Sequence, residues 1–441
     1  MTSDGASHSP VSTARVTGAV TRLADTRIAL LGWPVAEIAD KLGRVGERFS
    51  DPADPLTRKT IEAVEAEAGL SIPMVRRIVS GMARDWTRAR LRELLAREFL
   101  DPTVLDGFVP DPRGRRRLRA LGDPVALHIG SGSVPGVSTT SMIRSLLVKT
   151  PVLIKPGGGD RALIEAFRHG LEEEAPELAA STAVLYWRSA EQAVLDAALL
   201  GVSRVVVYGS DAAAAKIRGK VPITTPITVY HHRFSIAVLG PDAMEGKEGE
   251  AAAAQLAWAV STFDQRGCVS PHRVYVLGAE REKLHAFGEG LARAMAAEAA
   301  KAAPGPIAPG GAARLQQYRA ELRMRAAVDP AVAIWSSPEA SWTVVVDPDP
   351  SSSSLGHTRG VVLVPVADRS EMASRLRTLG PHLQSAGIAG VGGASSLADE
   401  LSELGVTRIV PLEELPFPPA WWAHDGSGPL RALIRWVEFE S

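Results

Sequence analysis

The sequence has almost no cysteine, because Cys268 is the single one among 441 residues. A lone cysteine cannot form a disulfide within the chain, so we expect a reducing compartment, the cytoplasm. Long apolar stretches are missing too: runs such as 28–35 and 203–208 are far shorter than the roughly 20 residues that a membrane-spanning helix needs. The polar N-terminus shows no apolar core of a signal peptide. We therefore predict a cytoplasmic protein without a membrane span.

The chain also lacks an excess of charge, since 49 Lys and Arg stand against 50 Asp and Glu. This balance provides no bulk attraction to nucleic acid or to a membrane surface. Metal-binding motifs are missing as well. There is no HExxH segment, and His231 and His232 are adjacent rather than on one face of a helix. We predict no nucleic-acid partner and no metal site.

Apolar residues make up 45% of the chain and change their period along it. Helical spacing comes first, and after Pro124 short β-branched runs alternate with segments of helical length, which predicts βαβ units and a parallel, doubly wound sheet. A second α/β block follows Cys268. The predicted segments are a disordered tail (1–15), a helical N-terminal region (16–121), a first α/β domain (122–262), a second α/β domain (263–415) and a C-terminal segment (416–441).

The first α/β domain contains five predicted strands, each a short run rich in β-branched residues. They are 125–129, 152–154, 183–186, 205–208 and 235–239. Open parallel sheets bind ligands beyond the carboxyl ends of their strands. Small residues and one lysine follow the first four of these strands, at 130–133, 155–159, 187–188 and 209–210. They suit a phosphate or a ribose, although no strict GxGxxG fingerprint is present.

Cys268 lies in the segment FDQRGCVSP, between a glycine and a proline that indicate a loop leading into a strand. A free cysteine is most often a small buried apolar residue. Here, however, Gln265, Arg266 and Gly267 are poor core neighbours, and the segment falls between two α/β blocks, where a cleft would form. We therefore predict that Cys268 is a nucleophile.

The segments FDQRGCVSP, HHRFSIAVLG, HIGSGSVPG and VLIKPGGGD together resemble the LuxC-type acyl-CoA reductases, which belong to the aldehyde dehydrogenase superfamily. The resemblance runs from about residue 125 to the C-terminus. It implies an α/β, aldehyde-dehydrogenase-like fold with two doubly wound α/β domains, an N-terminal helical region and a small oligomerisation element. Domain 122–262 would bind a nicotinamide cofactor, domain 263–415 would carry the thiol, and segment 416–441 would join the oligomerisation element or return to the cofactor domain.

The resemblance also implies a set of cofactor-binding residues at the strand ends. Lys155 matches the lysine that binds the adenosine ribose or its 2′-phosphate, and Gly209 matches a turn beside the nicotinamide. Arg188 favours NADPH, with NADH left open. The residues predicted to bind the cofactor are Lys155, Pro156, Gly157, Arg188, Gly209 and Ser210.

In the catalytic site, Cys268 matches the family nucleophile, and two departures from the family pattern matter. Ser133 stands where an asparagine amide would help to hold the oxyanion. The stretch 229–233 lacks the glutamate that activates water in hydrolytic relatives, so the chain is expected to reduce an acyl-enzyme rather than hydrolyse it. His231 and His232 are candidates to act near the thiol or on the leaving sulfur, and together with Arg266 they are candidates to lower the thiol pKa.

The predicted reaction is the NAD(P)H-dependent reduction of a long-chain fatty acyl thioester to the aldehyde. The thioester is an acyl-CoA, which makes coenzyme A part of the substrate, or an acyl-protein, which implies a partner protein that transfers acyl groups. The alternatives are an acyl-phosphate reductase, a CoA-acylating aldehyde dehydrogenase and a catalytically silent scaffold. The resemblance also implies a homo-oligomer.

Overall fold

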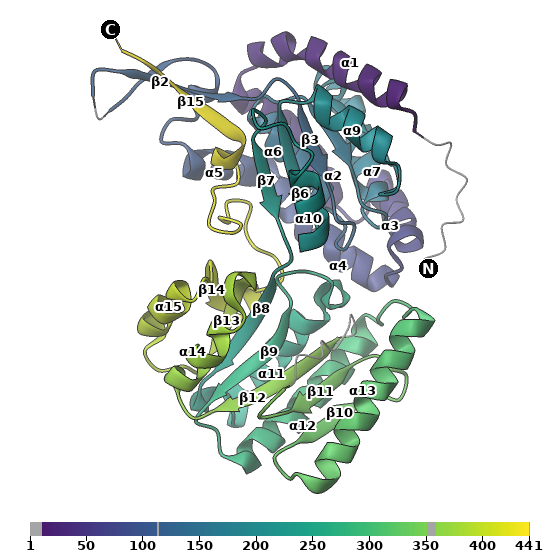
Figure 1. Cartoon of the computed structure of the whole chain (residues 1–441), viewed down its shortest axis with the longest axis vertical. Helices are drawn as coiled ribbons and strands as arrows, with labels where there is room; N and C mark the ends of the chain where they lie inside the picture. Colours follow the sequence, from purple (N-terminus) through teal and green to yellow (C-terminus); the bar gives the residue numbers. More distant parts are fainter. Residues whose placement is uncertain (1–10, 113, 351–358, 441) are drawn as a thin grey trace.

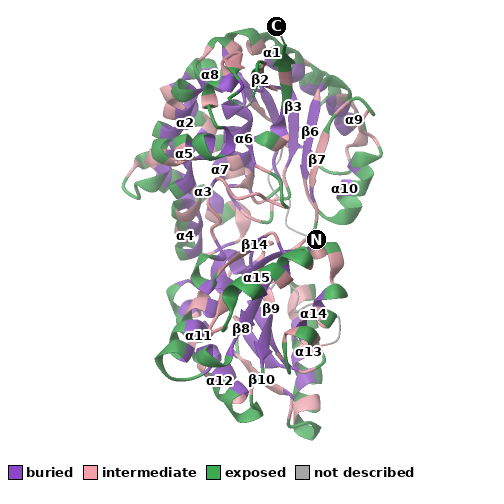
Figure 2. Ribbon diagram, turned by 90° about the vertical axis from the view of Figure 1, so that its left-hand side faces the viewer, coloured by how far each residue is buried: buried purple, intermediate pink, exposed green. Residues whose placement is uncertain are grey.

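The computed structural model describes residues 11–112, 114–350 and 359–440. The chain forms two lobes, one above the other in Figure 1, and each is built on its own largely parallel β-sheet. Figure 2 shows both sheets as buried layers between helices whose outer faces are exposed. Within these described ranges, no helix has a stretch that is long and apolar enough to cross a bilayer.

Five helices precede the first sheet and pack in the upper lobe, most of the first helix in one apolar core and the other four in a second. They are α1 (Thr13–Gly32), α2 (Val35–Ser50), α3 (Pro55–Ala68), α4 (Ile72–Ala83) and α5 (Arg88–Glu98). Apolar residues recur along them every three or four positions, and in α2 Ile38, Leu42 and Val45 are fully buried. Phe49 stacks on Phe167 with 5.7 Å between ring centroids, so these helices share a core with the sheet that follows.

The N-terminal tail predicted for residues 1–15 is too long. Residues 1–10 lie outside the described part of the chain, but Val11 is buried and α1 already begins at Thr13. The Ser12 hydroxyl accepts a hydrogen bond from the Arg15 backbone N–H at 3.2 Å. A serine-rich start therefore serves here as a helix N-cap, because its oxygen satisfies an N–H that the first turn leaves free.

The upper lobe contains a five-stranded parallel sheet in the order β5-β4-β3-β6-β7. Its strands are β3 (Ala126–Ile129), β4 (Val152–Lys155), β5 (Thr182–Val184), β6 (Arg204–Tyr208) and β7 (Ile227–Tyr230). Its helices are α6 (Val137–Leu147), α7 (Arg161–Glu174), α8 (Pro176–Ala180), α9 (Gln192–Gly201) and α10 (Asp211–Arg218). The strand order reverses beside β3, where the carboxyl ends of β3, β4 and β6 meet at one edge. In Figure 1, β7 runs from this sheet toward the lower lobe.

The lower lobe contains a seven-stranded sheet in the order β10-β11-β12-β9-β8-β13-β14, in which only β10 is antiparallel to its neighbour. Its strands are β8 (Phe234–Leu239), β9 (Pro271–Leu277), β10 (Ala333–Ser336), β11 (Thr343–Val346), β12 (Gly360–Val366), β13 (Leu383–Ala389) and β14 (Arg408–Pro411). Its helices are α11 (Gly246–Ser261), α12 (Arg281–Lys301), α13 (Pro309–Val328), α14 (Arg369–Arg377) and α15 (Ala394–Glu403).

The position of β8 differs from the sequence prediction, which assigns residues 122–262 to one domain. β8 pairs with β9 and β13, so both β8 and the following α11 belong to the lower lobe. The chain therefore changes sheets between β7 and β8. A βαβ pattern specifies strands and helices, but it does not specify which sheet a strand joins, because that depends on the apolar faces available to cover it.

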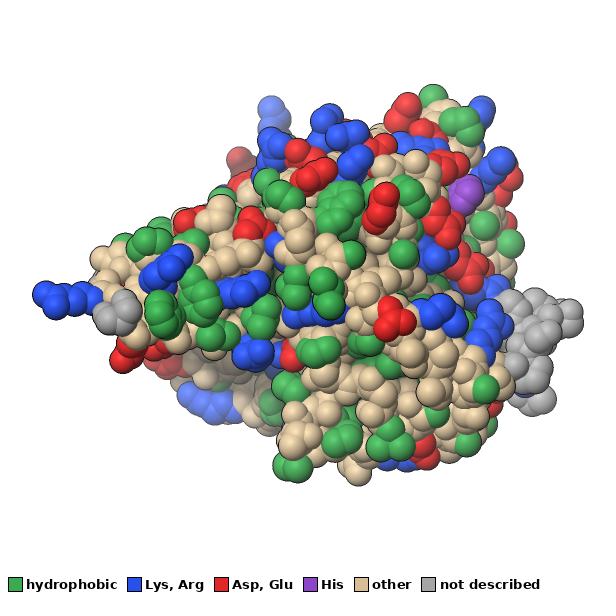
Figure 3. All heavy atoms as spheres, turned by 90° about the horizontal axis from the view of Figure 1, so that it is seen from above, with side chains coloured by type: hydrophobic (Ala, Val, Ile, Leu, Met, Phe, Trp, Pro, Cys, Tyr) green, Lys and Arg blue, Asp and Glu red, His purple; other side chains and the backbone are tan. Residues whose placement is uncertain are grey.

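The C-terminal segment returns to the upper lobe. β15 (Ile434–Phe439) pairs antiparallel with β2 (Arg117–Gly122), which also pairs with β1 (Val109–Pro110). This three-stranded sheet projects from the upper lobe in Figure 1, and in Figure 3 the projection carries hydrophobic side chains between basic ones. The region predicted as wholly helical therefore ends in two strands, whose partner strand comes from the far end of the chain.

Candidate active site

Cys268 lies in a turn between the 3₁₀ helix η4 (Thr262–Gln265) and β9. It is partly buried and packs against the core cluster that includes the upper sheet and the N-terminal helices. The Ser235 hydroxyl, at the start of β8, donates to the Cys268 carbonyl at 2.8 Å. The thiol is thus held by the lower lobe and contacts the upper one.

The three residues Phe263, Asp264 and Gln265 have left-handed backbone conformations, with φ of 61°, 51° and 61°. Each costs roughly 1–2 kcal/mol for a residue other than glycine, so surrounding contacts must hold the segment. Two of its side chains make such contacts. The Gln265 amide donates to the carbonyls of Pro271 and Gly360 at 2.9 and 2.6 Å, and Arg359 donates to Asp264 at 2.6 and 3.0 Å. These bonds orient the loop that carries Cys268.

Arg359→Ala is expected to lower the free energy of unfolding by about 3–5 kcal/mol, because removing one partner of a buried ion pair leaves the other charge uncompensated. Asp264 and Arg359 are 4% and 1% exposed, so little water can replace the lost guanidinium. The control is Arg293→Ala, because its partner Glu289 is an exposed neighbour on the same helix. Denaturant unfolding would measure the free energy of unfolding of Arg359→Ala and of Arg293→Ala. Equal effects of the two substitutions would contradict the buried-pair interpretation.

The amide of Gln384 is the polar side chain that the lower lobe places beside the thiol. Gln384 belongs to β13 and is 1% exposed. Its Nε2 donates to the Asp425 carboxylate at 3.1 Å, and the same side chain lowers the pKa of the Cys268 thiol. The amide thus bonds a carboxylate and also acts on the thiol. Sequence reasoning missed Gln384; the available signal was a glutamine within an otherwise small and apolar strand.

Asp425 lies in a tight turn near the C-terminus and acts on the thiol through its charge. Asp425 and Gly426 both have positive φ, 55° and 81°, and His424 forms an antiparallel bridge with Ser427. An Asp-Gly pair favours such a turn, because both residues tolerate positive φ. The Arg233 guanidinium lies 3.0 Å from the Asp425 carboxylate, so the charge of this carboxylate is partly compensated. Sequence reasoning missed Asp425 as well.

The electrostatics of the site keep the thiol protonated. The pKa of Cys268 is raised to about 11, chiefly by burial and then by the Asp425 carboxylate, while hydrogen bonds from Gln384 and from the backbone N–H groups of Cys268 and Val269 act in the opposite direction. Burial also raises the pKa of Asp425. Arg266, expected to lower the thiol pKa, instead donates to the Ala68 and Gly69 carbonyls at 2.7 and 3.0 Å.

A column of aromatic rings runs from the upper sheet to the turn near the C-terminus. Tyr208, Tyr230, His424 and Trp422 are stacked in this order, with 4.6, 4.4 and 4.4 Å between successive ring centroids. His424 is partly buried, and burial together with the charges of two arginines lowers its pKa to about 3. It is therefore neutral near pH 7. The column joins the carboxyl ends of β6 and β7 to the turn that carries Asp425.

The predicted cofactor residues lie at the carboxyl ends of β4, β5 and β6. Lys155 ends β4, and its ammonium lies 5.9 Å from the Tyr186 ring and 5.7 Å from the Trp187 ring. Burial lowers its pKa. Pro156 and Gly157 follow, and a Cβ on Gly157 would lie 2.1 Å from the Gly132 nitrogen, so the loops after β3 and β4 meet backbone to backbone.

The remaining predicted cofactor residues are more exposed. Gly209 follows β6, and the Ser210 hydroxyl accepts from the Ala213 N–H at 3.4 Å as the N-cap of α10. Arg188 is exposed, and its backbone N–H donates to the Glu191 carboxylate at 2.6 Å. Glu191 also acts on the pKa of Lys155. This edge therefore combines a buried ammonium, a nearby carboxylate, a helix N-terminus and closely packed glycines.

Ser133, His231 and His232 are not brought to the thiol by any contact within the described residues. Ser133 is exposed, and its N–H points to the Ser131 hydroxyl at 3.4 Å. His231 and His232 face Asp211 and His382 instead. The amide that acts on the thiol pKa comes from Gln384.

Comparison with solved structures gives the class of protein. The benzaldehyde dehydrogenase of Corynebacterium glutamicum, described as NAD-dependent, superposes with a TM-score of 0.73 at 16% identity over 99% of this chain and 92% of that one. The glyceraldehyde-3-phosphate dehydrogenase of Bacillus halodurans, determined with NADP, superposes with a TM-score of 0.74 at 14% identity over 98% and 91%. The chain has the aldehyde dehydrogenase fold, which confirms the predicted fold class.

Sequence comparison narrows the class. Residues 32–436 match the family described as acyl-CoA reductase (LuxC). The chain belongs to this family, as the resemblance in its motifs predicts. The long-chain acyl-protein thioester reductase of Aliivibrio fischeri is 25% identical over 92% of this chain and 82% of its own length. Long-chain acyl-protein thioester reductase 2 of Photobacterium leiognathi is 23% identical over 80% and 71%.

Proposed function

We propose that this protein reduces an acyl thioester to the aldehyde through an acyl group carried on Cys268. The observation that carries the proposal is the position of Cys268, which is hydrogen-bonded to Ser235 of the lower lobe, packs against the core of the upper lobe and is acted on by Gln384 and Asp425. The names of the relatives support a thioester substrate with a long acyl chain. An acyl-CoA and an acyl-protein are both donors that this site would accept, because both present the same thioester group.

A nicotinamide nucleotide fits the carboxyl edge of the upper sheet. The glycine loops allow a ligand to come close to the backbone, and the N-terminus of α10 favours an anion. The Lys155 ammonium suits a ribose or its phosphate. When bound, the reduced nucleotide supplies the hydride. Arg188 favours NADPH, whereas Glu191 near Lys155 would suit the ribose hydroxyls of NADH.

The residues around the thiol would share the proton and charge transfers. Asp425 accepts the Cys268 proton, and the resulting thiolate attacks the substrate carbonyl. The oxyanion that develops is held by the Gln384 amide and the Cys268 backbone N–H. The substrate C–S bond then breaks, and the leaving thiolate takes the proton from Asp425. Hydride addition to the Cys268 thioester would leave a thiohemiacetal oxyanion, whose collapse releases the aldehyde and the Cys268 thiolate; the thiolate then takes a proton from solvent.

The direct test measures oxidation of NADPH and NADH with acyl-CoA substrates from short to long chains, together with aldehyde formation. We expect cofactor oxidation and aldehyde in equal amounts. Reduction of acyl phosphates alone would favour an acyl-phosphate reductase, and release of fatty acid without cofactor would favour a hydrolase. A fully folded protein that never forms an acyl adduct on Cys268 would favour a scaffold.

The raised pKa of the thiol predicts a distinctive pH dependence of its reactivity. Because the thiolate is the reactive form, the alkylation rate of the cofactor-free protein by iodoacetamide is expected to rise about tenfold per pH unit and to be still rising near about pH 10. An ordinary cysteine, with a pKa of about 8.5, levels off earlier. Asp425→Asn removes a like charge, so it should speed alkylation at about pH 8. A plateau near about pH 8 in the unaltered protein would contradict the enclosed thiol.

We also propose that the sheet β1-β2-β15 is the oligomerisation element. β15 is an edge strand of this sheet, and its Trp436 and Phe439 are 46% and 49% exposed. An exposed edge with apolar side chains is suited to pairing with a second copy of the chain.

A further inference from the structure

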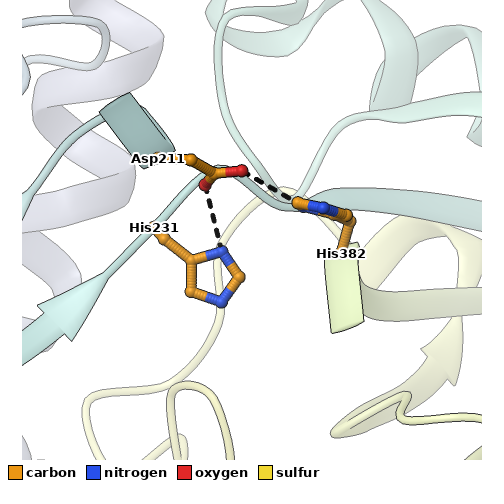
Figure 4. Close-up of side chains that lie close together, drawn as sticks. All are labelled: Asp211, His231 and His382. Atoms are coloured by element: carbon orange, nitrogen blue, oxygen red, sulfur yellow. Dashed lines mark ion pairs between the residues drawn. The ribbon is translucent and has the colours of Figure 1, made fainter. Parts of the chain in front are cut away.

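Three side chains from distant parts of the sequence converge where the two lobes meet (Figure 4). Asp211 is the first residue of α10, His231 follows β7, and His382 ends the 3₁₀ helix η5 (Gly380–His382) before β13. The His231 Nδ1 lies 3.4 Å from one Asp211 carboxylate oxygen, and the His382 Nδ1 lies 3.9 Å from the other. One ligand atom of each residue lies within 4.8 Å of the other two. Among the residues that the structure describes, this is the one group of three or more histidine, cysteine or acidic side chains whose spacing would suit a metal ion.

A backbone oxygen adds a fourth ligand atom. The backbone carbonyl of His232 lies 3.1 Å from the His231 Nδ1 and 2.9 Å from the His382 Nδ1. Zinc bonds to nitrogen and oxygen are about 2.0–2.2 Å long, so neighbouring ligand atoms of a tetrahedral site lie about 3.3–3.6 Å apart. The separations given above, from 2.9 to 3.9 Å, bracket this range, so each would have to change by only a fraction of an ångström.

The chemistry of the four groups selects a class of ion. Two imidazole nitrogens with two oxygens suit Zn²⁺, Co²⁺ or Ni²⁺, whereas Mg²⁺ and Ca²⁺ prefer sites made of oxygen alone. The His232 backbone N–H lies 3.2 Å from the Asp211 carboxylate and orients it, as outer hydrogen bonds do around metal ligands. Such an arrangement also resembles a simple hydrogen-bonded cluster, in which both imidazoles donate to oxygen. Direct measurement of metal binding separates the two.

We propose that Asp211, His231, His382 and the His232 carbonyl bind one transition metal ion, with Zn²⁺ as the type, which links the two lobes. Asp211 and His231 belong to the upper lobe, His382 belongs to the lower lobe, and His232 lies in the segment that joins them. The ion would bind the folded chain only, because the ligands come together through tertiary structure. It would also engage His231 in a task other than acid–base chemistry at the thiol. This proposal does not depend on the proposed reaction.

The test uses the full chain without a histidine tag, freed of metal by a chelator. Titration with CoCl₂ is expected to produce the visible absorption of tetrahedral Co²⁺, saturating at one ion per chain, and dialysis against ZnCl₂ followed by elemental analysis should give the same ratio. Zn²⁺ should also raise the Tm, because a ligand that binds only the native state stabilises it. His382→Ala and Asp211→Asn should each weaken binding by at least about 10–100-fold, the loss that removal of even an outer partner causes.

His169→Ala is the matched control. His169 lies 3.7 and 3.4 Å from Glu172 and Glu173 on the exposed face of α7, so it represents a histidine that could collect metal without a built site. It should bind Co²⁺ as the unaltered protein does. The proposal is overturned if no tetrahedral absorption develops, if both His382→Ala and Asp211→Asn bind like the unaltered chain, or if His169→Ala removes the binding. Two variants are used so that a folding defect in one, visible in its metal-free Tm, does not decide the result.

Discussion

Cys268→Ser is expected to lower kcat/KM for acyl thioester reduction by on the order of 10⁴-fold or more, because a serine hydroxyl does not ionise near neutral pH and cannot carry the acyl group as a thioester. The surrounding loop should survive, since its bonds involve Gln265, Asp264 and Arg359 rather than the sulfur. Cofactor oxidation under saturating acyl-CoA measures the loss, and mass spectrometry of the protein after incubation with acyl-CoA reports the adduct.

The controls for this substitution are the stability of the fold and the binding of the reduced nucleotide. Cys268→Ser should keep the Tm of the unaltered protein and should still bind the reduced nucleotide, as followed by its fluorescence. Retention of more than about a hundredth of the activity would show that the acyl group is not carried on this sulfur.

Gln384→Leu is expected to lower kcat by about 10²–10³-fold with a much smaller change in KM, because an amide that holds the oxyanion acts in the transition state rather than in substrate binding. The leucine fills a similar volume within β13 and leaves Asp425 paired with Arg233. Steady-state kinetics with one acyl-CoA and with saturating cofactor separate kcat from KM.

Two matched variants show which residue holds the oxyanion. Ser385→Ala changes the neighbouring buried residue, whose hydroxyl has no hydrogen-bond partner within the described chain, and it should leave kcat unchanged. Ser133→Ala tests the residue at the position of the family asparagine and should change kcat by less than about threefold if Gln384 does this work. A large loss from Ser133→Ala with little loss from Gln384→Leu would reverse the assignment.

Local structure in the upper sheet is close to what the sequence predicts. Strands expected at 125–129 and 152–154 are observed as β3 and β4, at Ala126–Ile129 and Val152–Lys155, and helices alternate with them as expected. These segments are predictable because strands buried on both faces read as continuous β-branched runs, and a helix after a glycine-rich turn continues the βα alternation. The family motifs at Cys268 and Lys155 are local for the same reason.

The candidate site is less predictable, because most of its members are far apart along the chain. Gln384 reads as one polar residue in a strand, and Asp425 reads as a turn residue next to glycine. His382 carries no metal-binding motif, and the sequence predicts no metal site because His231 and His232 are adjacent. Only residues that follow one another in sequence can be paired by spacing alone.

The sequence by itself determined that Cys268 is an isolated thiol in a loop that leads into a strand, and that its motifs are those of the acyl-CoA reductase (LuxC) family. The hydrophobic period and the composition of a loop are properties of consecutive residues, so they can be determined without knowing the fold. Only the tertiary structure decided that β8 joins the lower sheet and that Gln384 and Asp425 lie where they act on the pKa of the Cys268 thiol. Those outcomes depend on how two lobes pack and how the C-terminal segment returns, which no local pattern encodes.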